Sequence, residues 1–90
     1  MKTGKFSIEE AKWAGNELGI DWNNYDIEQF RMGLETELEH GLADPVTNVT
    51  GDDLIMTAKI ALAHLKEIPD YYTRLKKMEA EAEAEMKLKK

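Results

Sequence analysis

The stretch from Lys59 to Glu79, KIALAHLKEIPDYYTRLKKME, decides the fold class. Before its proline, apolar residues recur at helical spacing, and with the residues just upstream they form one face: Leu54, Ala58, Ala61, Leu62, Leu65 and Ile68. Pro69 disfavours helical geometry at the residue before it, and Asp70 is a residue type that caps a new helix. The stretch therefore predicts two helices, near residues 51–67 and 71–86, with a sharp break at Pro69.

Two further helices are predicted upstream, near residues 8–18 and 27–40. Each begins with two residues, three apart, that can form a capping box, and each ends with a glycine followed by an apolar residue. The capping pairs are Ser7 with Glu10 and Asp26 with Gln29, and the glycines are Gly19 and Gly41. The centres of the two longest apolar stripes predict a core that contains Leu34, Leu38, Leu62 and Leu65.

These elements predict an all-α protein, a small bundle of about four helices with a charged helical C-terminal tail. At 90 residues the chain has room for one small core, so we expect a single α-helical domain over residues 1–78. In residues 79–90 glutamate alternates with alanine, which has the period of a strand. Their composition of good helix formers, with opposite charges four residues apart, instead predicts a partly frayed helical tail.

Composition excludes several classes of protein. The chain has no cysteine, which rules out a disulfide framework and a thiolate metal site. The N-terminus lacks the apolar region of a signal peptide, and no run approaches the roughly 18 apolar residues of a membrane span. We therefore expect a cytoplasmic protein that neither is exported nor crosses a membrane.

The charge distribution points to the kind of partner. The net charge is −6, and the segment from Met32 to Ala58 contains six acidic residues but no lysine or arginine. Such a surface disfavours nucleic acid, because phosphates need basic residues, and suits a protein partner with a basic surface. The predicted interaction surface comprises Glu35, Glu39, Asp44, Asp52 and Asp53.

An alternative function is suggested by two carboxylate and imidazole pairs. Glu37 and His40, and likewise His64 and Glu67, are three residues apart, a spacing that helical bundles use to hold divalent metals. The second pair has the reverse order, however, and an antiparallel hairpin would separate Glu37 from His64 by two to three helical turns. Only a long excursion of the loop after Ala43 would bring them together, so we expect no cofactor, with a divalent metal as the alternative.

The motifs of common enzymes are missing from the sequence. Its hydroxyl residues do not lie in a Gly-x-Ser-x-Gly turn, and no glycine-rich phosphate loop is present. The chain is therefore expected not to be an enzyme, with metal-dependent catalysis part of the alternative above.

Two segments are more patterned than core packing requires: FRMGLETELEHGLADPVTNVTGDD over residues 30–53, and the stretch over residues 59–79. They resemble a family of small proteins from bacteria and their phages catalogued as a domain of unknown function. The resemblance extends from about Phe6 to Glu79, and its most specific elements are Glu-His-Gly at residues 39–41 and Ala-His-Leu at residues 63–65. It implies a self-contained intracellular α-helical domain but no activity, so an accessory or protein-interaction domain is the leading hypothesis.

Overall fold

Four helices make up the fold of the protein. The computed structural model describes residues 5–43, 46 and 53–88. The helices are α1 (Ile8–Glu17), α2 (Ile27–Ala43), α3 (Leu54–Glu67) and α4 (Tyr71–Leu88), and no strand occurs in these described segments. The all-α fold and the four predicted helices are confirmed.

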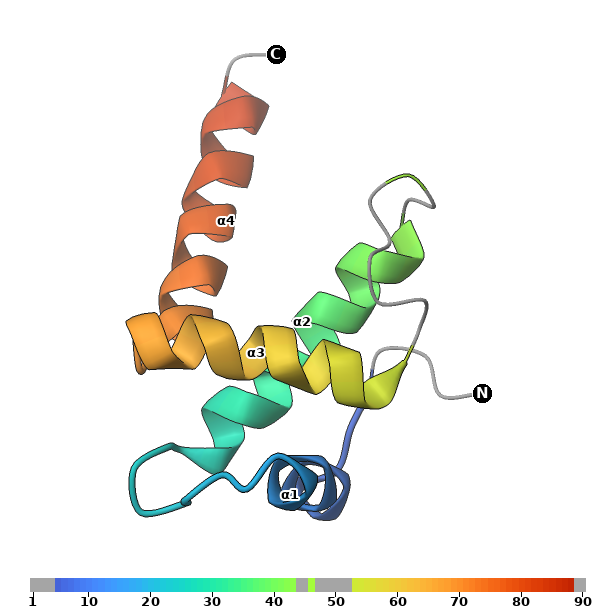
Figure 1. Ribbon diagram of the computed structural model, residues 1–90. Helices are drawn as coiled ribbons and strands as arrows, with labels where there is room; N and C mark the ends of the chain where they lie inside the picture. The colour runs from blue at the N-terminus through green and yellow to red at the C-terminus, as the bar shows by residue number, and fades with distance from the viewer. Residues whose placement is uncertain (1–4, 44–45, 47–52, 89–90) are drawn as a thin grey trace.

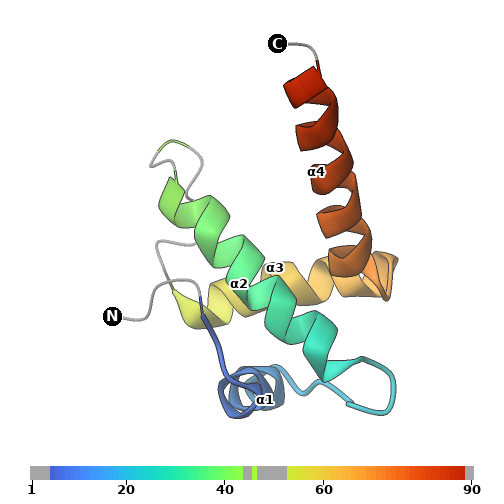
Figure 2. The same cartoon turned by 180° about the vertical axis from the view of Figure 1, so that it is seen from behind.

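Helices α2 and α3 cross each other at the centre of the molecule. Helix α3 passes in front of α2 in Figure 1 and behind it in Figure 2, while α1 lies below the crossing. Helices α2 and α3 therefore do not form the simple antiparallel hairpin that would separate Glu37 from His64. Helix α4 starts beside the end of α3 and stands away from the other three helices (Figure 1).

Helix α1 begins and ends as its sequence predicts. The Ser7 amide donates to Glu10 Oε1 (2.9 Å), and the Glu10 amide donates to Ser7 Oγ (3.1 Å), which completes the capping box. At the other end Gly19 has a left-handed φ of 73°, and the Ile20 amide donates to the Gly15 carbonyl at 3.0 Å. This is the Schellman geometry expected of a glycine followed by an apolar residue.

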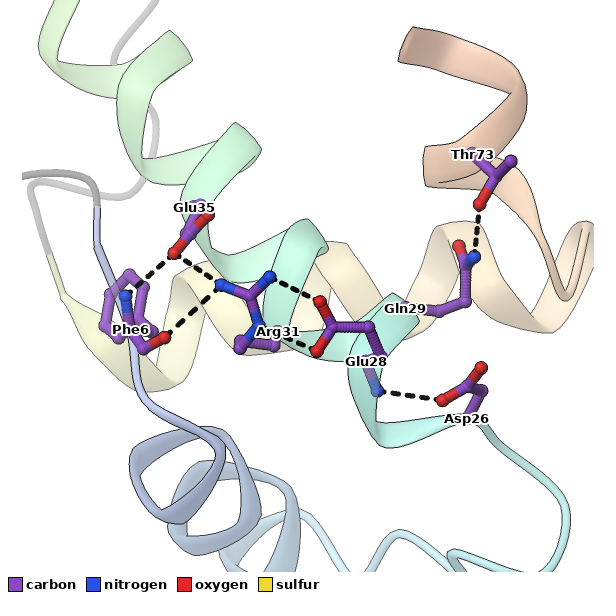
Figure 3. Close-up of polar contacts among 7 residues, drawn as sticks. All are labelled: Phe6, Asp26, Glu28, Gln29, Arg31, Glu35 and Thr73. Carbon is purple, nitrogen blue, oxygen red and sulfur yellow. Dashed lines mark hydrogen bonds and ion pairs between the residues drawn. The ribbon is translucent and has the colours of Figure 1, made fainter. Parts of the chain in front are cut away.

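Helix α2 departs from its prediction at both ends. The Glu28 amide donates to Asp26 Oδ1 (2.9 Å), but Gln29 does not complete a capping box, because its amide nitrogen donates to Thr73 Oγ1 of α4 (2.5 Å; Figure 3). The buried side-chain oxygen of Gln29 has no hydrogen-bond partner. The helix also continues through Gly41 to Ala43, since glycine permits a left-handed ending without imposing one.

The break between α3 and α4 lies where Pro69 predicts it. Ile68 adopts an extended conformation (φ −137°, ψ 106°), as expected for a residue before proline. At the start of α3 the Asp53 side chain accepts from the Met56 amide at 3.0 Å, so Asp53 is the N-cap.

None of the helices in the described segments combines the length and the hydropathy that a membrane span requires.

The core lies around the crossing of α2 and α3. Leu34, Leu38 and Leu65 are buried as predicted, whereas Leu62 is only half-buried and packs at the edge of the core. The largest fully buried side chain is that of Tyr72, which belongs to the first turn of α4. This tyrosine joins α4 to the core and also takes part in the candidate site.

Candidate functional site

Three polar side chains from three different helices meet beside the core. The hydroxyl of Tyr72 on α4 donates to Glu37 Oε2 on α2 at 2.8 Å. His64 Nδ1 on α3 lies 3.0 Å from the Tyr72 hydroxyl and 3.0 Å from Glu37 Oε2. We call these three residues the Glu37–His64–Tyr72 cluster.

The hydrogen bonds of the cluster define the tautomer of His64. Because the Tyr72 hydroxyl gives its hydrogen to Glu37, its oxygen is an acceptor on the side that faces His64. Nδ1 therefore faces two acceptor oxygens and is assigned as the protonated nitrogen. The ring of Tyr71 stacks on the imidazole, with centroids 4.4 Å apart and planes inclined by 16°. The His64 side chain remains 32% exposed, so the cluster is open to solvent on the histidine side.

Backbone features place Tyr72 in the cluster. The extended residue before Pro69 turns the chain so that the first turn of α4 returns to the core. On α2, Gly33 allows the tyrosine ring to approach closely, because a Cβ atom at this position would lie 2.5 Å from Tyr72 Cε2 and 2.9 Å from Ala61 Cβ. Any larger residue at position 33 would displace the ring and with it the hydroxyl.

The environment of Tyr72 favours its neutral form. Burial raises the pKa of the phenol most, and the hydrogen bond to Glu37 and the negative charge of that carboxylate raise it further. An unfolded tyrosine titrates near pH 10, so above about pH 10 the unfolded state releases a proton that the folded state retains. The stabilising contribution is therefore complete below about pH 10 and is lost as the pH rises toward the folded pKa.

We accordingly predict that the free energy of unfolding falls above about pH 10, by up to about 1.4 kcal/mol per pH unit from this residue alone. Urea denaturation at pH 8 to 11 measures the effect. Tyr72→Phe removes the titrating group, and its stability should decrease less steeply over the same range. Equal slopes for the parent and the variant would contradict the prediction.

The structure brings two of the four predicted metal-site residues together. Glu37 and His64 are in contact. The separation by two to three turns that an antiparallel hairpin would impose does not occur, because α2 and α3 cross at an angle. Glu67 is exposed, and the side chain of His40 lies outside the described part of the molecule. Within the described residues no group of three or more histidine, cysteine, aspartate or glutamate side chains could hold a metal ion.

Sequence reasoning missed Tyr72 as the third member of the cluster. Tyr71 and Tyr72 follow Pro69 and Asp70 at the predicted start of the fourth helix, and the sequence predicts no chemical role for them. A tyrosine with one apolar and one polar end, placed one turn after a helix break, is the available signal. What the cluster offers chemically is one carboxylate oxygen, one imidazole nitrogen and one phenol oxygen within 3.0 Å of each other.

The predicted interaction residues lie in different environments. Glu35 accepts hydrogen bonds from the Phe6 amide (2.9 Å) and from Arg31 Nη1 (2.8 Å), so it holds the N-terminal segment against α2 (Figure 3). Glu39 is exposed, and Asp53 is exposed while capping α3. Asp44 and Asp52 lie outside the described residues.

Arg31 is the centre of the second polar cluster, which Figure 3 shows. Its guanidinium bonds to both oxygens of Glu28 as well as to Glu35. Arg31 holds the pKa of Glu28 below its usual range, mainly through this hydrogen bonding, and Glu28 in turn raises the pKa of Arg31. The cluster holds one positive and two negative charges, so Arg31 compensates Glu28 and Glu35 only in part.

Fold and cluster together define a small all-α bundle in which a buried tyrosine joins a glutamate and a histidine. The chain belongs to the family DUF5661, described as a protein of unknown function, whose model matches residues 11–81. This confirms the resemblance to a domain of unknown function. No curated protein and no solved structure matches the chain.

Proposed function

We propose that this protein is a protein-interaction domain that binds a basic, amphipathic helix along α4. The observation that carries the proposal is an apolar stripe on the part of α4 that stands away from the body. Met78 and Met86 are 56% and 66% exposed, and Ala82 lies between them at helical spacing. We call these three residues the α4 stripe.

Glutamates border the α4 stripe on both sides. At about 100° per residue, Glu79 and Glu83 lie on one flank, and Glu81 and Glu85 lie on the other. All four are exposed. An apolar stripe between two acidic flanks is complementary to a helix with an apolar stripe between two basic flanks.

Other properties of the surface support the same kind of partner. Methionine side chains are flexible and polarizable, and they are common on surfaces that adapt to a partner helix. Glu39 and Asp53 are also exposed, and their negative charge adds to the potential of the surface, which favours a basic partner. The contact area of two methionines and one alanine is modest, so the association is weak and depends on charge.

Binding of a synthetic helical peptide tests this function. The probe is an amphipathic peptide of about 18 leucine and lysine residues, and its control is a scrambled peptide of the same composition. In calorimetric titrations we expect the amphipathic peptide to bind and the affinity to fall as salt is added, since exposed charges are screened.

A pair of variants locates the binding site of the peptide. Met78→Ser with Met86→Ser should weaken binding by about tenfold or more. Met56→Ser is the matched control, because Met56 is a methionine 47% exposed on α3, outside the α4 stripe, and its variant should bind like the parent. Equal binding of the scrambled peptide, or equal loss in both variants, would refute the proposal.

Divalent-metal binding is a second candidate function, favoured by the 3.0 Å distance between Glu37 Oε2 and His64 Nδ1. A carboxylate oxygen and an imidazole nitrogen this close can bind one ion if the ion displaces the proton from Nδ1. Zinc, manganese and ferrous iron titrated into untagged, chelator-treated protein test the candidate. Binding abolished by Glu37→Gln and by His64→Gln, but unchanged in Glu67→Gln, would support it. Absence of binding in every titration would leave the cluster a structural element.

A further inference from the structure

We infer that the helix bound along α4 is the α4 helix of a second copy of this chain, packed antiparallel. This inference rests on the proposed function, whose basic, amphipathic partner it identifies. The first part of α4 has the required chemistry, because Arg74 and Lys76 lie on the two flanks of Leu75, which packs at the edge of the core. The chain thus carries both an acidic segment and a basic segment on the same helix.

The order of charges along α4 favours the antiparallel arrangement. The basic residues Arg74 and Lys76 come first, and glutamates follow at positions 79, 81, 83 and 85. Parallel helices in register would place basic residues against basic residues and acids against acids. Antiparallel helices that cross near residue 80 place each basic segment against the acidic segment of the other copy.

The register that pairs the charges also places part of each stripe against the other. In antiparallel helices, residues on the same flank of the two stripes face each other. Arg74 and Glu85 lie on one flank, so each faces the other across the interface, and Lys76 faces Glu83 in the same way on the second flank. Twofold symmetry makes each of these two contacts occur twice. The same register sets Met78 opposite Ala82.

Within the described residues, the part of this surface beyond Leu75 is uncovered, while Leu75 itself packs at the edge of the core. Every residue from Lys76 to Lys87 is exposed, and the Arg74 side chain is 70% exposed although it bonds to Asp70. The area available on α4 is below that of a stable dimer, and the two Glu79 residues approach each other near the twofold axis. We therefore expect a weak dimer with a Kd on the order of 0.1 mM.

A charge exchange between two variants tests the inference on the full chain. Arg74→Glu with Lys76→Glu places acids against acids, and Glu83→Lys with Glu85→Lys places bases against bases. By sedimentation equilibrium each variant alone should associate at least about tenfold more weakly than the parent. An equimolar mixture restores all four attractive contacts and should associate within about threefold of the parent.

The control makes the same change in net charge as Arg74→Glu with Lys76→Glu, but on the opposite side of α4. Lys77→Glu with Lys87→Glu should leave self-association within about threefold of the parent, and circular dichroism checks that each variant keeps its helicity. A parent that stays monomeric at millimolar concentration, or a mixture that does not associate, overturns the inference. If the leucine–lysine peptide still binds α4 in that case, the proposed function stands and only the identity of the partner is wrong.

Discussion

Replacing Tyr72 with alanine is expected to lower the free energy of unfolding by about 3–5 kcal/mol. The ring is fully buried and packs against Gly33 at the junction of three helices, so its removal leaves a cavity that rigid backbone cannot fill. The hydrogen bond from its hydroxyl to Glu37 is lost as well. Since a domain of this size has a total stability on the order of 5–10 kcal/mol, the variant should lose a large share of it.

Two variants separate the causes of this effect. Tyr72→Phe keeps the ring and should cost about 1–3 kcal/mol, because the partly buried Glu37 loses a hydrogen-bond donor. Tyr71→Ala removes a half-buried ring that stacks on His64 and should cost less than Tyr72→Ala. Urea denaturation of the three variants provides the measurement. A Tyr72→Ala protein within 1 kcal/mol of the parent would show that the tyrosine does not hold α4 to the core.

The positions of the helices could be predicted because their signals are local. The Ser7 capping box, the left-handed Gly19 and the break at Pro69 each depend on residues within one or two turns. Predictions failed where a tertiary contact competes with a local one. Gln29 has the spacing of a capping box, but its amide bonds to Thr73, which is 44 residues away.

The candidate site could be predicted only in its composition. Glu37 and His64 were identified by residue type and spacing, yet their contact depends on how α2 crosses α3, and helical periodicity contains no information on that angle. Tyr72 depends on the same crossing and on Gly33, whose role is a close approach between helices. Glu35 shows the converse, because an acid in a segment without bases is paired with Arg31, one turn earlier on α2.

Truncation of Leu65 is expected to cost about 2–5 kcal/mol, whereas truncation of Leu62 should cost about 1–2 kcal/mol. The sequence assigns both leucines to the same stripe of α3. In the structure Leu65 is 1% exposed within the core, while Leu62 is half-buried at its edge. Both substitutions are leucine to alanine inside one helix, so helix propensity changes equally and the difference reports burial. Urea denaturation of Leu65→Ala and Leu62→Ala measures it. Equal losses in the two variants would mean that α3 presents both side chains to the core and that its orientation against α2 differs from the one described.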